Sequence, residues 1–218
     1  MMLDYITYGN INNPKQLVIL LHGYGSNKND LITLAPELAQ YLPDALFISP
    51  NAPEDLEGEL YYNMDAHQWF SLSERTEQKM YQGANKASLI LEAFIKQQLE
   101  KFQLSFSNIA LVGFSQGAMM ALHTGLRLSE RVRGIVGYSG LLIAPDKLKS
   151  EIKSKPSVML VHGVEDNVVP IEEMEQAYKA LDDNEVISYK YKCNRLAHGI
   201  DAYGIRIGGS FLSEIFNK

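Results

Sequence analysis

The sequence is poor in cysteine, in long apolar runs and in positive charge. Cys193 is the only cysteine among 218 residues, which excludes an intrachain disulfide and a multi-cysteine metal site. The apolar run at residues 17–21 ends at His22, far short of the ~18 residues that indicate a membrane span. The chain has 20 Lys and Arg against 26 Asp and Glu, a net charge of −6, which argues against nucleic acid as a partner. No Lys or Arg precedes Lys15, so the sequence predicts no secretory leader and a cytoplasmic location.

The remaining composition is that of a globular protein. Hydrophobic residues make up 46% of the chain and charged residues 21%, which is far from the composition of disordered proteins. The length exceeds the ~150 residues of an average domain without reaching twice that value. Because no linker or repeat divides the sequence, we expect residues 1–218 to form a single domain.

Short runs of aliphatic and β-branched residues predict the strands. They lie at residues 17–21, 45–49, 109–112, 134–138 and 158–161, and each is followed by a polar or glycine-rich break and a helix-like stretch. Continuous apolar character is typical of strands covered on both faces. Residues 186–192 alternate more, and together with residues 3–8 they are expected near the sheet edges. This pattern predicts a three-layer α/β domain with a mainly parallel sheet and helices on both faces.

Apolar residues at helical spacing predict the helices between these strands. Residues 30–41 form one such stretch, with Asn29 or Asp30 as its cap, and residues 78–102 form a longer one. A third begins at Pro170, since proline is tolerated at a helix start. The last stretch, residues 202–216, is a weaker prediction because its three glycines each disfavour a helix by up to ~1 kcal/mol.

Ser115 stands in a G-x-S-x-G motif where the predicted strand 109–112 gives way to a helix-like run. In this motif the serine occupies a sharp, strained turn, and small residues two positions before and after it let strand and helix approach. The following helix N-terminus supplies backbone N–H donors. We therefore interpret Ser115 as a nucleophile, and the alternative is an ordinary glycine-rich turn.

A serine nucleophile needs a base, and the position of each histidine favours His198. His123 lies two helical turns beyond the serine and points elsewhere. His22 and His162 each end an apolar strand and are followed by glycine, a setting that suits a hydrogen bond fixing a loop. His67 lies in a loop-like segment. His198 follows the predicted edge strand late in the chain, as the histidine of a Ser, Asp, His order does.

The carboxylate that orients the base is predicted between Ser115 and His198. Asp166 fits best because it stands in the loop just beyond the strand 158–161. Glu165 is the alternative, while Asp182 and Asp183 are typical of a solvated helix end.

A second glycine-rich turn, HGYGS at residues 22–26, follows the first strong strand. It lacks the G-x-G-x-x-G pattern and the P-loop ending, which excludes those nucleotide loops. The backbone N–H of Tyr24 and that of Gln116 are the expected oxyanion donors. The alternative is a tight turn without a catalytic role.

Four ordered motifs resemble the phospholipase/carboxylesterase family of α/β-hydrolases, which includes the acyl-protein thioesterases. They are LLHGYG at 20–25, GFSQG at 113–117, HGxxDxxVP at 162–170 and the late His198. Gln68-Trp69-Phe70 also resembles the family's loop near the acyl site. The resemblance implies hydrolysis of esters or thioesters by Ser115, Asp166 and His198.

The resemblance also bears on the substrate and on partners. It implies an acyl-bearing ester or thioester as substrate and no metal or organic cofactor, and the length leaves no room for a cap domain. Trp69, Phe70, Leu72 and Met119 are predicted acyl contacts, although such residues are more often plain core. Residues 60–81 lack periodicity and are predicted to form a flap over the site. Two alternatives are a short-chain esterase and a hydrolase-like protein that binds without catalysis.

Overall fold

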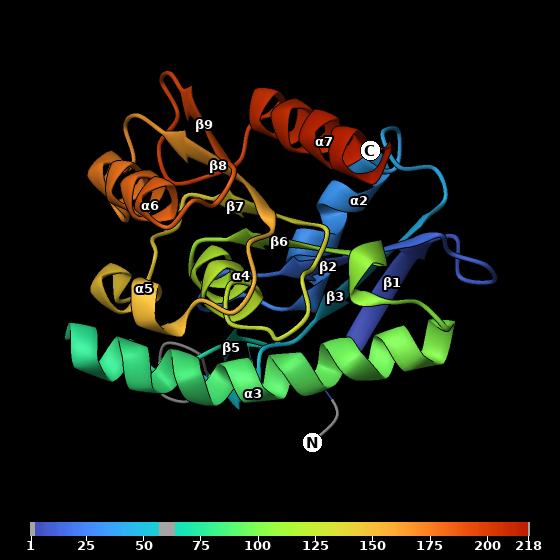
Figure 1. Ribbon diagram of the computed structural model, residues 1–218, viewed down its shortest axis with the longest axis horizontal. Coiled ribbons are helices and arrows are strands. Elements are labelled where there is room, and N and C mark those ends of the chain that lie inside the picture. Colours follow the sequence, from blue (N-terminus) through green and yellow to red (C-terminus); the bar gives the residue numbers. More distant parts are fainter. Residues whose placement is uncertain (1–2, 57–63, 218) are drawn as a thin grey trace.

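A mostly parallel sheet forms the centre of the molecule in the computed structural model, which describes residues 3–56 and 64–217 (Figure 1). The sheet has seven strands in the order β1-β3-β2-β6-β7-β8-β9. Only β1 pairs antiparallel, with β3; the other pairs are parallel. The strands are β1 Tyr5–Gly9, β2 Gln16–Leu21, β3 Ala45–Pro50, β6 Ile109–Phe114, β7 Gly134–Tyr138, β8 Ser157–Gly163 and β9 Ser188–Cys193.

The apolar runs found in the sequence form the five inner strands, and the segments predicted near the edges, residues 3–8 and 186–192, overlap the edge strands β1 and β9. The edge strand β9 begins at Ser188, two residues later than predicted. The inner strands are almost wholly buried because helices cover both of their faces. The predicted α/β class and the mainly parallel sheet are therefore confirmed.

Side chains of β2 point alternately into two separate hydrophobic cores. Leu17, Ile19 and Leu21 pack in the core beneath α3, α4 and α6, and Val18 and Leu20 pack in the core beneath α2 and α7. Figure 1 shows α3 running along one side of the sheet and α2 and α7 along the other. The helices are α1 Lys28–Leu31, α2 Ala35–Leu38, α3 Glu77–Phe102, α4 Gln116–Gly125, α5 Leu148–Glu151, α6 Ile171–Asp183 and α7 Ala202–Asn217.

The predicted continuous helix at residues 30–41 is wrong. The segment is instead two short α-helices, α1 and α2, joined by the 3-10 turn Ile32–Leu34. Pro36 in the first turn of α2 has no N–H to donate backwards, which interrupts the α-helical hydrogen bonds. The cap is Asn27, whose Oδ1 accepts from the backbone N–H of Asn29 at 2.8 Å.

The final helix, α7, is continuous although it contains three glycines. A Cβ at Gly208 would lie 2.0 Å from the Tyr138 hydroxyl oxygen, and one at Gly209 would lie 2.4 Å from the ring of Tyr41. The glycines thus let α7 pack closely against β7 and against the end of the α2 region. This packing compensates for their low helix propensity.

The segment between β3 and α3 departs from the alternation of strands and helices. Within its described part it adds the short antiparallel pair of β4 Glu54–Asp55 and β5 His67–Gln68. Residues 57–63 of the predicted flap region lie outside the described residues. Among the described helices, none has the length and apolar character that crossing a membrane requires.

Candidate active site

Ser115 lies on the sharp turn between β6 and α4, at the carboxyl edge of the sheet. Its backbone has φ 53° and ψ −118°, in the positive-φ range that is unfavourable for a residue with a Cβ. A Cβ at Gly117 would lie 1.8 Å from the Leu21 carbonyl oxygen, and one at Gly113 would lie 2.2 Å from that of Gly117. Only glycine at both positions lets the strand and helix approach closely enough to form this turn.

The structure brings Ser115, His198 and Asp166 together from three separate loops. His198 Nε2 lies 3.0 Å from Ser115 Oγ, and His198 Nδ1 lies 2.7 Å from Asp166 Oδ2. Asp166 follows β8 and His198 follows β9, so both loops leave the same edge of the sheet as Ser115. The contacts form a continuous hydrogen-bonded chain from hydroxyl to imidazole to carboxylate.

The Asp166 side chain has no exposed surface, and both of its carboxylate oxygens accept hydrogen bonds. Its Oδ1 accepts hydrogen bonds from the backbone N–H groups of Val168 and Val169, both at 2.9 Å. Burial alone would raise the pKa of Asp166, but the hydrogen bonds from His198 and from these backbone groups hold the pKa below its usual value. The carboxylate is therefore charged at neutral pH and fixed in orientation. The alternative carboxylate, Glu165, is exposed to solvent.

The loops of Asp166 and His198 are held against each other by Gly163 and His162. A Cβ at Gly163 would lie 2.3 Å from the Leu196 carbonyl oxygen, so a larger residue would push the His198 loop away. His162 Nε2 donates to the Val169 carbonyl oxygen at 2.8 Å, closing the loop that carries Asp166. His162 thus fixes a loop, as predicted from its position at the end of a strand; it is the penultimate residue of β8.

Two further histidines are buried and neutral. His22 Nδ1 donates to the Gly23 carbonyl oxygen at 2.8 Å, and its Nε2 accepts from the backbone N–H of Ala52 at 2.9 Å. Burial lowers the pKa of His22 to about 4 and that of His123 to about 3. His123 is a fully buried residue of α4, and its Nε2 lies 2.9 Å from Asn85 Oδ1. Neither imidazole faces Ser115 as a base would.

The glycine-rich loop after β2 lies directly beside Ser115. β2 and β6 are parallel neighbours with Leu21 opposite Gly113, and a Cβ at Gly23 would lie 3.4 Å from the Ser115 Cβ. Tyr24, which follows Gly23, is partly exposed at this edge. Gln116 is the first residue of α4, where a backbone N–H has no carbonyl partner within the helix. Both predicted donors therefore come from backbone that adjoins the serine.

The Gln116 side chain has a structural role that sequence reasoning missed. Its Oε1 accepts from the backbone N–H of Trp69 at 2.9 Å, and its Nε2 donates to the Phe70 carbonyl oxygen at 2.7 Å. The Trp69 indole N–H donates to the His22 carbonyl oxygen at 2.9 Å. These partners are more than 45 residues apart in the chain, so no local sequence pattern predicts these hydrogen bonds. They tie residues 69–70 to both loops beside Ser115.

Comparison with known proteins identifies the family. The phospholipase/carboxylesterase family model matches residues 7–215. The chain belongs to the phospholipase/carboxylesterase family. Acyl-protein thioesterase 1 of Saccharomyces cerevisiae is 33% identical over 204 residues, 86% of this chain and 87% of the relative. Acyl-protein thioesterase 1 of Emericella nidulans is 28% identical over 219 residues, 91% and 89% of the two chains.

A solved structure agrees with this assignment. The crystal structure of esterase PE8 is 38% identical to this chain, with a TM-score of 0.91, and covers 99% of this chain and 100% of its own. The suspected family and the α/β-hydrolase fold are thus confirmed. As a member of the phospholipase/carboxylesterase family, the chain is a hydrolase of carboxylic esters or thioesters.

The predicted acyl contacts differ in how much surface they offer to a substrate of this family. Trp69 and Phe70 are each only 1% exposed and belong to the core beneath α3 and α4. Met119 is also buried, whereas Leu72 is partly exposed at the edge of the same core. Contact with an acyl chain stays a prediction for all four, as does mobility of the 60–81 region.

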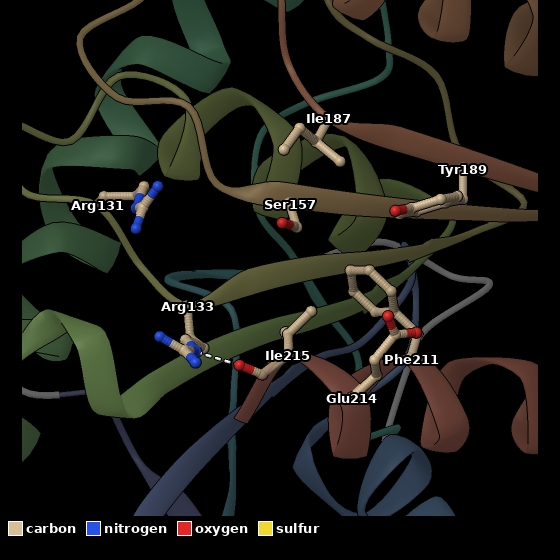
Figure 2. A pocket seen from close by; sticks show the side chains of 8 residues that line it. All are labelled: Arg131, Arg133, Ser157, Ile187, Tyr189, Phe211, Glu214 and Ile215. Atoms are coloured by element: carbon tan, nitrogen blue, oxygen red, sulfur yellow. Dashed lines mark hydrogen bonds between the residues drawn. The ribbon is translucent and has the colours of Figure 1, made fainter. Parts of the chain in front are cut away.

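A pocket lies at the amino edge of the sheet, whereas Ser115 lies at the carboxyl edge. Figure 2 shows the side chains that line this pocket. Arg133, Ser157 and Tyr189 line it together with the last turns of α7, and Ser157 is the first residue of β8. Arg133 Nε donates to the Ile215 carbonyl oxygen, shown as a dashed line in Figure 2. Ser115, Asp166 and His198 lie at the other end of these strands.

Cys193 is the only cysteine of the chain, and it is buried. Burial raises the pKa of the Cys193 thiol to about 11, which keeps it protonated. Within residues 3–56 and 64–217, no group of three or more His, Cys, Asp or Glu side chains is arranged to hold a metal ion.

Proposed function

We propose that Ser115, His198 and Asp166 act as a catalytic triad that hydrolyses acyl esters or thioesters through an acyl-enzyme. The observation that carries this proposal is the chain of contacts from Ser115 Oγ to His198 at 3.0 Å and from His198 to Asp166 at 2.7 Å. Because an ionised carboxylate accepts a hydrogen bond, Asp166 favours the imidazole with its proton on Nδ1. Nε2 is then free to accept the serine proton.

Acylation begins with attack of Ser115 Oγ on the substrate carbonyl carbon while His198 Nε2 takes the hydroxyl proton. The carbonyl π electrons move to oxygen, and the backbone N–H groups of Tyr24 and Gln116 stabilise this oxyanion. Collapse of the intermediate breaks the bond to the alkoxide or thiolate, which takes the proton from His198 Nε2. The leaving alcohol or thiol departs, and the acyl group remains on Ser115.

Deacylation repeats these steps with water as the nucleophile. His198 Nε2 removes a proton from water as its oxygen attacks the acyl carbonyl, and the same two backbone donors hold the second oxyanion. His198 then returns the proton to Ser115 Oγ as the carboxylic acid leaves. The buried Asp166 carboxylate stabilises the imidazolium in both half-reactions.

The substrate is proposed to be an acyl group joined to an alcohol or thiol, and a cytoplasmic location is part of the proposal. Relatives named acyl-protein thioesterase and esterase support the proposed substrate class. Rates with a p-nitrophenyl ester series from acetyl to palmitoyl measure the preferred chain length. A rate that rises with chain length supports a long-chain hydrolase, and one that falls supports the short-chain alternative.

Ser115→Ala tests the triad directly. We expect kcat on p-nitrophenyl esters to fall about 10⁶-fold, because no other hydroxyl occupies the elbow. Ser129→Ala, which removes an exposed serine between α4 and β7, should leave kcat unchanged. A fluorophosphonate probe should label the wild-type protein and not Ser115→Ala. Near wild-type turnover by Ser115→Ala would overturn the proposal, and unlabelled, inactive wild-type protein would favour binding without catalysis.

A further inference from the structure

A short segment, residues 67–70, touches the backbone on both sides of Ser115. At one end, His67 pairs with the loop after β2: the Gly25 N–H donates to the His67 carbonyl oxygen at 2.9 Å, and the His67 N–H donates to that of Ser26 at 2.8 Å. At the other end, Trp69 and Phe70 hold the Gln116 side chain through two hydrogen bonds. The segment therefore contacts both the loop that carries the Tyr24 N–H and the residue that carries the second proposed donor, Gln116.

Tyr24 is fixed from both of its neighbours in this arrangement. Gly25 is bound to His67, and the Gly23 carbonyl oxygen is bound by His22, whose own carbonyl oxygen accepts from the Trp69 indole. A displacement of residues 67–70 would consequently move the Tyr24 N–H relative to that of Gln116. Two donors act on one oxyanion only when both lie within about 3 Å of it.

The His67 ring anchors this segment to the protein. Nε2 lies 2.8 Å from Asp65 Oδ1, to which a protonated Nε2 donates, and 2.9 Å from Asn51 Nδ2, from which an unprotonated Nε2 accepts. Nδ1 lies 2.9 Å from Asp55 Oδ1 without forming a hydrogen bond. Asp55 is directly opposite His67 in the β4–β5 pair. Asn51 Oδ1 in turn accepts from the backbone N–H of Lys28, the first residue of α1. One imidazole thus connects the end of β3, β4 and the turn before β5.

We propose that His67 is a positioning residue that keeps the backbone N–H groups of Tyr24 and Gln116 at the spacing needed to bind one oxyanion. It acts through backbone: its ring, held through Nε2 by Asp65 or Asn51, fixes the 67–70 segment, which in turn fixes Tyr24 and Gln116. The inference rests on the proposed function, since it assigns a purpose to those two N–H groups. It makes the β4–β5 pair a support of catalysis, although no side chain of that pair reaches Ser115.

His67→Phe tests the proposal because it keeps a planar ring and the backbone pairing but removes both ring nitrogens. We expect kcat to fall roughly 10-fold with KM within twofold, a part of the 10²- to 10³-fold loss that follows removal of a whole oxyanion donor. Affinity for an alkyl boronic acid, which forms a tetrahedral adduct with the serine, should weaken by the same factor. Asp65→Ala, at an exposed carboxylate, should lower both values in the same direction and decides the question if His67→Phe does not fold.

Asp44→Ala is the matched control for Asp65→Ala, since Asp44 is likewise a partly exposed carboxylate with a close partner, Lys15 Nζ at 2.6 Å, and lies just before the amino end of β3. It should keep the wild-type kcat and boronic acid affinity. The proposal is overturned if His67→Phe and Asp65→Ala behave as wild type, or if Asp44→Ala loses as much activity as they do. Failure of the triad itself would appear separately, as activity retained by Ser115→Ala.

Discussion

At the carboxyl edge of the central sheet, the loops after β6, β8 and β9 converge on one hydroxyl group, whereas the polar side chains at the amino edge do not meet at one atom. Ser115, His198 and Asp166 form a chain of contacts with one free end, the Ser115 oxygen. At the amino edge, Arg133 instead donates to the last turn of α7. The pocket in Figure 2 is lined partly by charged residues, but these do not converge on one reactive atom. A serine in a strained turn, with its hydrogen-bond partners already aligned, is stronger evidence of a catalytic site.

The largest effect is expected when the charge of Asp166 at the carboxyl edge is removed without a change of side-chain shape. Asp166→Asn keeps Oδ1 as an acceptor for Val168 and Val169, but its amide no longer stabilises the His198 imidazolium or the required tautomer. We expect kcat on p-nitrophenyl esters to fall about 10⁴-fold. Glu165→Gln, at the exposed neighbouring carboxylate, should retain wild-type kcat. Equal losses in the two variants would contradict the assignment of Asp166.

Much of this edge could be predicted from the sequence because its signals are local. Continuous apolar runs mark the inner strands, and glycines around Ser115 mark the elbow, since a Cβ at either position would collide with backbone. The positions of Asp166 and His198 follow from the rule that functional loops leave the carboxyl ends of parallel strands. Their roles remain predictions that the variants above measure.

The features that could not be predicted depend on contacts distant in sequence. Gly208 and Gly209 weaken a helix locally, and only the rings of Tyr138 and Tyr41 explain why α7 needs them. The hydrogen bonds of the Gln116 side chain to residues 69–70 likewise join separate parts of the chain. The broken helix at residues 28–38 is different, because Pro36 was visible and its missing N–H was a local signal of the break.

The second prediction concerns stability at low pH, to which the buried histidine of the carboxyl edge contributes. His22 has a pKa of about 4 in the folded protein and ~6.5 when unfolded, so between these values the unfolded chain binds a proton that the folded chain does not. The free energy of unfolding should therefore fall as pH drops from ~6.5 towards 4, by up to ~1.4 kcal/mol per pH unit for this group. His123 adds a similar dependence that extends to about pH 3.

Urea denaturation between pH 7 and 5 measures this effect. His22→Gln, which keeps a donor and an acceptor but does not titrate, should show a shallower pH dependence than the wild type. Asp166 does not interfere, since its lowered pKa means that its contribution is present above the unfolded value of ~3.9 and lost only below it. Identical pH dependence in the two proteins would show that His22 protonation does not limit stability.

The third and smallest effect is expected at the amino edge, where Arg133 contributes to stability and not to catalysis. Its Nε–H donates to the Ile215 carbonyl oxygen in the last turn of α7, and its positive charge lies near the negative end of the helix dipole. Arg133→Met should lower the free energy of unfolding by about 1–2 kcal/mol, while kcat stays at the wild-type value. Arg131→Met, at the exposed arginine that lines the same pocket, is the control and should change stability by less than about 0.5 kcal/mol. If Arg133→Met lowered kcat by more than its loss of folded protein, the two edges would be coupled and the contrast between them would no longer hold.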